Sequence, residues 1–102
     1  MERSFSVGAP GTGNTIKLYS VAFPGADDVN GLDSLAGVLG SLKPVQKTQL
    51  LDLRTLGIPL DNVEGMTIGP KLPDGRKSLL LVSDNNFAAS QFTQFLLFAL
   101  RK

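Results

Sequence analysis

The sequence DNVEGMTIGPKLPDGRKSLLLVSDNNF, residues 61–87, has the pattern of a single β-hairpin. Residues 62–68 are typical of a strand, and residues 78–83, SLLLVS, are typical of the returning strand. The segment between them contains the Pro and Asp-Gly signals of a turn. Antiparallel pairing brings the start of the first strand beside the end of the second. We therefore expect Glu64 and Asp84 to lie at the same end of one sheet.

Four other segments of the chain also indicate strands. Residues 3–7 and 16–23 alternate as strands do, and residues 45–53, VQKTQLLDL, carry the polar positions of a sheet edge. Residues 92–100, FTQFLLFAL, favour a strand over a helix. This last segment and residues 79–82 contain continuous apolar runs, which are typical of strands covered on both faces. Such cover requires layers of sheet, as in stacked blades or a sandwich.

One segment, residues 31–42, predicts a short or irregular helix. Its apolar residues recur at helical spacing, with Asn30 or Asp33 as possible caps, and Pro44 follows its end. These apolar residues are Leu32, Leu35, Val38, Leu39 and Leu42. Three glycines in the segment weaken the helix. Asp33 and Asp52 are interpreted as cap and surface residues rather than catalysts.

The composition of the 102-residue chain excludes several kinds of chemistry. Apolar residues make up 42% and charged residues 19%, which is ordinary for one small globular domain. The net charge is +1, without a basic cluster, so no nucleic-acid partner is expected. The chain has no cysteine and no histidine, which excludes disulfides, imidazole bases, and the usual ligands of zinc and haem.

The apolar runs of the chain are too short for a membrane span. They fall well below the ~20 residues that a spanning helix needs. Residues 1–8, MERSFSVG, lack the apolar core of a signal peptide and resemble the end of a strand. We therefore expect that the chain begins part-way through a larger architecture. Its localisation is left unassigned.

The glycine-rich segment GAPGTGNT, residues 8–15, resembles a phosphate-binding loop at every position except one. Asn14 stands where that motif has its lysine. The motif must also open a helix, but residues 16–23 are typical of a strand. The segment is therefore interpreted as a flexible connection between two strands, and no nucleotide is expected.

A weak internal repeat suggests a β-propeller. A polar cluster with Phe, a loop and an apolar strand occur in that order from residue 2, and again from residue 84. This is the period of propeller blades, and the chain covers about one and a half of them. The predicted fold is therefore mainly β, with antiparallel sheets of blade type and one short helix near residues 31–42. The alternative is a small independent α+β domain. Residues 1–102 form either a single domain or a fragment.

Four segments carry a resemblance to a known family. They are ERSFS, KTQLLDL, the hairpin sequence of residues 61–87, and QFTQFLLFAL. In order and spacing they resemble the C-terminal part of the phytase-like family, whose domain is called "esterase-like activity of phytase". The distinctive blocks are N-x-E-G and S-D-N-N-F. The resemblance implies a β-propeller that hydrolyses phosphoesters or esters, with calcium as a candidate cofactor and with members often exported from bacterial cells.

In such a propeller, the strand ends of two adjacent blades open on one face. This arrangement would gather the polar residues Glu2, Arg3, Glu64, Asp84, Asn85 and Asn86. Oxygen ligands without nitrogen or sulfur suit calcium, so Glu2, Glu64, Asp84 and Asn85 are the candidate metal ligands. Glu64 and Arg3 are the candidate catalytic residues, because Arg3 can form a bidentate contact with phosphate. The expected partner is a phosphorylated or ester small molecule.

Structural interpretations of the same residues stay open. Glu64 can mark a strand entrance, residues 84–86 a turn that bonds its own backbone, and Glu2 with Arg3 a solvated ion pair. Catalysis by this chain alone is not expected, because a propeller funnel needs the whole ring. One alternative function is a non-catalytic binding or scaffold module. Another is a small domain that self-associates through exposed strand edges, or a piece that packs on further blades.

Overall fold

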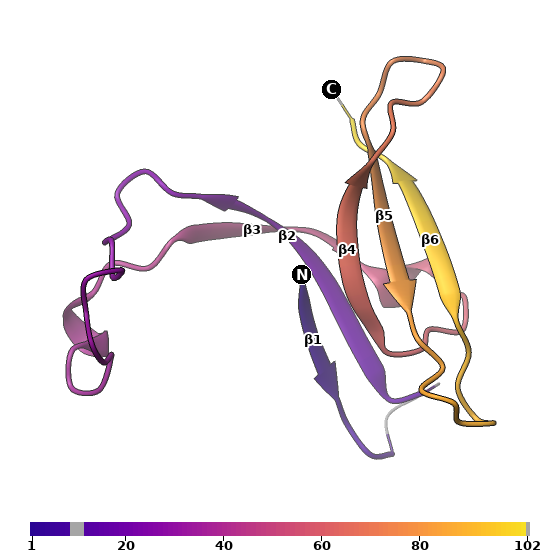
Figure 1. Ribbon diagram of the computed structural model, residues 1–102, viewed down its shortest axis with the longest axis horizontal. Helices are drawn as coiled ribbons and strands as arrows, with labels where there is room; N and C mark the ends of the chain where they lie inside the picture. Colours follow the sequence, from indigo (N-terminus) through magenta and orange to yellow (C-terminus); the bar gives the residue numbers. More distant parts are fainter. Residues whose placement is uncertain (9–11, 102) are drawn as a thin grey trace.

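The computed structural model describes residues 1–8 and 12–101. The middle of the glycine-rich segment, residues 9–11, and Lys102 lie outside the described residues. The described chain forms two antiparallel three-stranded sheets, which follow one another in sequence (Figure 1). The first sheet contains β1 (Glu2–Phe5), β2 (Asn14–Ala22) and β3 (Gln46–Asp52), in that order. The second contains β4 (Val63–Gly69), β5 (Ser78–Ser83) and β6 (Gln94–Ala99), also in that order.

The prediction of a mainly β fold with antiparallel sheets is confirmed. Every predicted strand is present within a few residues of its expected bounds, and residues 92–100 form a strand rather than a helix. β3 pairs only with β2, which places it at the edge of the first sheet as expected. The α+β alternative is wrong, because the described residues contain no α-helix. Two successive antiparallel sheets are consistent with parts of two blades.

The helix predicted near residues 31–42 is reduced to one 3-10 turn, η1 (Leu39–Ser41). The remainder of that segment consists of turns and bends. Gly37 explains the difference, because its φ of 81° lies in the left-handed region and interrupts any right-handed helix. The apolar side chains of the segment also have no core to cover, since Leu32, Leu35 and Leu39 are exposed. Helical spacing without a surface to pack on does not produce a helix here.

A small hydrophobic core lies between the two sheets. Six apolar side chains are buried there: Ile16, Leu18, Leu53, Leu60, Val63 and Leu81. β2 supplies two of them from the first sheet, while β4 and β5 supply two from the second. The 3-10 turn η2 (Leu53–Leu56) follows β3 and places Leu53 in the core. The core therefore holds one face of each sheet against the other.

The rest of the molecule is open. The β2–β3 hairpin projects as an arm away from the second sheet (Figure 1). The radius of gyration is 16.9 Å, whereas a compact chain of this length has one of about 13 Å. The side chains of Phe95 and Leu97 on β6 are 67% and 59% exposed. In the described part of the chain, no helix has the length and apolar character needed to cross a membrane.

Candidate functional site

The predicted hairpin is confirmed, and its register places the candidate residues. Val63 pairs with Ser83 at one end of the β4–β5 ladder, and Gly69 pairs with Ser78 at the other. Glu64 lies beside Val63 and Asp84 follows Ser83, so both are at the same end of the second sheet, as predicted. The turn of the hairpin is at the opposite end.

Glu64 occupies an irregularity in the ladder. Gly65, not Glu64, pairs with Val82, so Glu64 is the extra residue of a β-bulge. A Cβ atom on Gly65 would lie 2.6 Å from Cγ1 of Val82, so this position accepts only glycine without a shift. A bulge turns its residue away from the regular alternation of the strand. The bulge therefore sets the direction in which the Glu64 side chain leaves the strand.

Arg3 reaches Glu64 from the first sheet. Its Nη2 atom is 3.9 Å from Oε1 of Glu64, and its Nη1 atom donates a hydrogen bond to Oδ1 of Asn62. Asn62 in turn donates from Nδ2 to Oε1 of Glu64. Arg3 pairs with the buried Ile16 across β1 and β2, which sets it on the core-facing side of the first sheet. The three side chains therefore form a polar bridge between the two sheets.

A hollow of about 400 Å³ adjoins this bridge. Arg3 and Asn62 line it, together with Asn14 at the start of β2 and with Ser90 and Gln91 from the loop before β6. The Arg3 and Glu64 side chains are 43% and 47% exposed, so water and solutes reach them. The arrangement places one cation, one carboxylate and amide groups at a solvent-accessible opening between the sheets.

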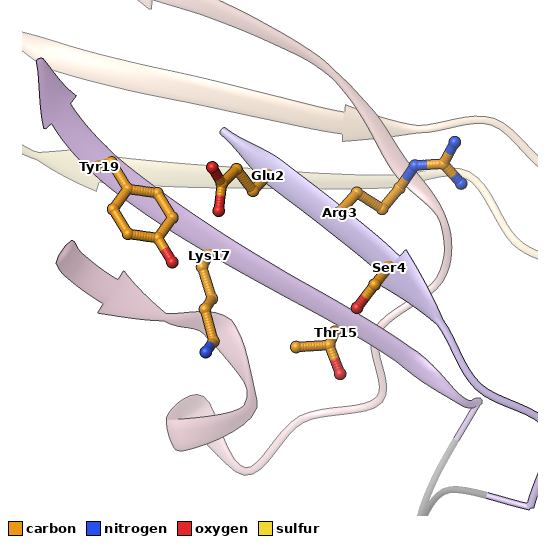
Figure 2. A pocket seen from close by; sticks show the side chains of 6 residues that line it. All are labelled: Glu2, Arg3, Ser4, Thr15, Lys17 and Tyr19. Carbon is orange, nitrogen blue, oxygen red and sulfur yellow. The ribbon is translucent and has the colours of Figure 1, made fainter. Parts of the chain in front are cut away.

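Glu2 lies on the other face of the first sheet. It forms an ion pair with Lys47, whose Nζ is 4.8 Å from the centroid of the Tyr19 ring. The hydrogen bond from Lys47 lowers the pKa of the Glu2 carboxyl, and the same bond raises the pKa of Lys47. Figure 2 shows Glu2 bent toward Tyr19 while Arg3 extends in another direction. The structure therefore brings Arg3, but not Glu2, to Glu64.

The loop after β5 binds mostly to itself. Asn85 Oδ1 accepts from the backbone N–H of Phe87 at 3.2 Å. Asn86 Nδ2 donates to the carbonyl oxygen of Asp84 at 3.3 Å and to Oε1 of Gln91 at 3.0 Å. Asn86 and Phe87 both have positive φ, as in a tight turn. The structural interpretation of residues 84–86 thus accounts for both asparagine side chains.

Glu2 lies apart from the other candidate calcium ligands. Among residues 1–8 and 12–101, no group of three or more acidic side chains is close enough to hold a metal ion. Of the four candidates, Glu2 faces Lys47 and Glu64 faces Arg3. Calcium takes about 6–8 oxygen ligands.

Sequence reasoning missed two residues of this region. Asn62 bridges Arg3 and Glu64, and the quoted N-x-E-G block contained it, although its partner is 59 residues away. Asp61 is 3% exposed, and its two carboxylate oxygens accept the backbone N–H groups of Asn62 at 2.7 Å and Phe92 at 2.6 Å. An acidic residue directly before a predicted strand was the available signal for Asp61.

Comparison with known proteins identifies the family. A family model named Phytase-like, described as "Esterase-like activity of phytase", matches residues 1–87. No curated protein and no solved structure matches the chain. The matched residues include β1 to β5 and every side chain of the bridge between the sheets. The chain therefore belongs to the phytase-like family.

Proposed function

We propose that this chain forms parts of two neighbouring blades of a phytase-like β-propeller and contributes to a site that binds a phosphoester or ester substrate. The observation that carries the proposal is the bridge of Arg3, Asn62 and Glu64 between the two sheets. It lies where strand ends of both sheets open, beside a hollow that solvent reaches. Membership of the phytase-like family supports hydrolysis as the reaction class.

Arg3 is the substrate-binding group in this proposal. Its Nη2 atom is 3.9 Å from Glu64, which is longer than a hydrogen bond, so the ion pair is loose. A phosphoryl group offers two oxygens to the planar guanidinium and competes well for it. Substrate binding would then release Glu64 from Arg3. Asn62 holds Glu64 at the site through the hydrogen bond from its Nδ2 atom.

Glu64 is the proposed general base. A water oxygen attacks the phosphorus of a phosphoester or the acyl carbon of an ester, and the Glu64 carboxylate takes the proton of that water. The bond to the leaving oxygen breaks, and the alcohol leaves with the proton returned from Glu64. Calcium in this site would need oxygen ligands beyond those near Glu64, and no step is assigned to it. Full activity is expected only in a complete ring.

The test begins with binding by the purified chain. Titration with p-nitrophenyl phosphate, followed by amide NMR signals, should shift residues 3, 62 and 64. The substitution Arg3→Gln should weaken this binding about tenfold, since it removes a hydrogen bond to a charged group. Arg76→Gln is the matched control, because Arg76 pairs with Asp74 in the hairpin turn at the other end of the second sheet. Unchanged signals at residues 3, 62 and 64 throughout the titration would contradict the proposal.

Hydrolysis is the second readout. In a complete ring that contains this chain, release of p-nitrophenol from the phosphate and acetate esters should fall about 100-fold in Glu64→Gln, as expected for loss of a general base. Arg76→Gln should leave the rate unchanged. Equal rates in the wild type and Glu64→Gln would remove the role of Glu64 as base, while the role of Arg3 in binding would still be tested by the titration.

A non-catalytic binding or scaffold module is the second candidate. It is favoured by one observation: Arg3, Asn62 and Glu64 satisfy one another across the two sheets, as structural residues do. Under this alternative, Arg3→Gln and Glu64→Gln lower the free energy of unfolding, and neither ester nor phosphate shifts the NMR signals. Urea denaturation of the same variants supplies the comparison.

A further inference from the structure

Lys17 lies between two carboxylates that bind other cations. In the register of the first sheet, Glu2 of β1 and Asp52 of β3 are its partners on either side. Glu2 is paired with Lys47. Asp52 is paired with Arg54, whose Nη2 atom lies 2.6 Å from Oδ2. The Arg54 hydrogen bond also lowers the pKa of the Asp52 carboxyl to about 2.

The Lys17 ammonium consequently has no ion pair within the described residues. The ion pairs found there join Arg3 to Glu64, Lys47 to Glu2, Arg54 to Asp52 and Arg76 to Asp74. Around Lys17, the three cations Lys17, Lys47 and Arg54 face the two carboxylates Glu2 and Asp52. One positive charge is left uncompensated on this face. Lys17 is half-buried, so its ammonium attracts an anion more strongly than a charge on an open surface would.

Two hydroxyl groups lie on the same face as Lys17. Thr15 is two residues before Lys17 on β2, so both side chains emerge from one side of the sheet. Ser4 is the partner of Thr15 across β1 and β2. Figure 2 shows the Lys17 side chain extending away from the Glu2 carboxylate, with the hydroxyls of Ser4 and Thr15 farther along the two strands. In residues 1–8 and 12–101, neither hydroxyl takes part in a side-chain hydrogen bond.

A hollow of about 470 Å³ covers these three side chains. Its lining also includes Arg3, and Glu2 and Tyr19, which mark the end where the Lys47 ion pair lies. One ammonium and two hydroxyls supply several donors in a short stretch of sheet. Two hydroxyl groups without side-chain hydrogen bonds, next to an uncompensated positive charge, suit a small anion that carries several acceptor oxygens.

We propose that Ser4, Thr15 and Lys17 form a binding site for a small oxyanion of the phosphate or sulfate class. This site is on the outer face of the first sheet, whereas the bridge of Arg3 and Glu64 is on the core-facing side. Arg3 lines both hollows, so the two sites are neighbours, and variants of Lys17 and of Arg3 distinguish them. The ligand is either the free ion or the terminal oxyanion group of a larger molecule, since both present the same oxygens.

The experiment is a titration of the full chain with inorganic phosphate and with sulfate, followed by amide NMR signals. Saturable shifts are expected at residues 4, 15 and 17, without shifts at residues 62 and 64. Lys17→Met should weaken the binding about tenfold, as expected for loss of a charged hydrogen-bond donor. Lys71→Met in the hairpin turn is the matched control and should bind as the wild type does.

Two further variants separate binding from folding. Lys17→Arg keeps the charge and should keep the affinity, so a loss in Lys17→Met with retention in Lys17→Arg supports the site. The double variant Ser4→Ala with Thr15→Val keeps the charge and removes both hydroxyls, and it should also weaken binding. Thermal unfolding followed by circular dichroism checks that each variant is folded. The same titration with O-phosphoserine distinguishes a free ion from a larger phosphomonoester.

Two outcomes would overturn the proposal. The first is the absence of saturable shifts at residues 4, 15 and 17 with phosphate, sulfate and O-phosphoserine. The second is binding that depends on Arg3 but not on Lys17, which would assign the anion to the bridge between the sheets. Failure of the Arg3 site leaves the prediction for Lys17 unchanged, so the two proposals are judged separately.

Discussion

Gly65 determines where Glu64 lies, because it lets the bulge form against Val82. A methyl group on Gly65 would meet Cγ1 of Val82 at 2.6 Å, in a sheet that must keep its pairing. We predict that Gly65→Ala lowers the free energy of unfolding by about 1–3 kcal/mol, the usual cost of overpacking. Urea denaturation measures it. Gly31→Ala is the control, because nothing lies within 4 Å of its added Cβ atom; equal effects of both substitutions would contradict the packing argument.

The ion pair of Asp52 with Arg54 should make the free energy of unfolding depend on pH in acid. The side-chain hydrogen bond from Arg54 lowers its pKa from 3.8 to about 2 in the folded protein. A carboxyl whose folded pKa is lowered contributes stability that is present above the unfolded pKa and lost as the pH falls toward the folded one. We expect Asp52→Asn to be less stable than the wild type at neutral pH. The difference should shrink between pH 3.8 and about 2. Urea midpoints at several pH values measure it, and a constant difference would contradict the assignment.

Single residues also show what the sequence did and did not predict about the site. Glu2 and Arg3 are adjacent in a strand, so their side chains leave opposite faces of the sheet, and only one of them can reach Glu64. This rule was available from the sequence, yet both residues were expected at one site. The contact of Arg3 with Asn62 was not predictable in the same way, because it depends on how two separate sheets pack.

At the scale of elements, local signals predicted the strands well. The β4–β5 hairpin follows from a Pro and Asp-Gly turn between two apolar runs, all within 27 residues of sequence. The helix prediction for residues 31–42 was wrong. Its apolar side chains have no surface to pack against, and Gly37 adopts a left-handed φ. Periodic apolar residues predict a helix only when another surface is present to cover them.

The loop at the end of the β2–β3 arm, residues 23–45, is predicted to be dispensable for folding. Ala22 and Gln46 are the last pair before the arm loop, and no residue between them belongs to the core. Replacing residues 23–45 with Asn-Gly closes the two strands with a tight turn of the favoured type. The free energy of unfolding should change by no more than about 0.5 kcal/mol, as for surface changes. A broad or lost unfolding transition in urea would show that the arm stabilises the sheets.

The whole molecule is extended and exposes apolar surface. Its extents are 43 × 40 × 24 Å, and among the described residues six buried apolar side chains form the core. Packing of the second sheet against more protein would cover Phe95 and Leu97, which lie on its edge strand β6. Which further strands would cover this surface could not be predicted from the sequence. Such packing depends on contacts between separate sheets, whereas the patterns used here are local.

We expect the isolated chain to self-associate through β6. Sedimentation velocity should show a mass above that of the monomer, increasing with protein concentration. The double substitution Phe95→Lys with Leu97→Lys should shift the distribution toward monomer, because charges on an edge strand oppose pairing. Val7→Lys, at an exposed residue outside the sheets, is the control. A monomer at every concentration would contradict this expectation.

The buried carboxylate of Asp61 has a consequence for strand alignment. β4 and β6 never pair with each other, since β5 lies between them. Asp61, just before β4, nevertheless accepts the N–H group of Phe92, two residues before β6 begins. A slip of β6 by one residue would turn its apolar set to the opposite face of the sheet. The bond from Phe92 opposes that slip from outside the ladder, so a single side chain fixes the alignment of two strands that are not paired.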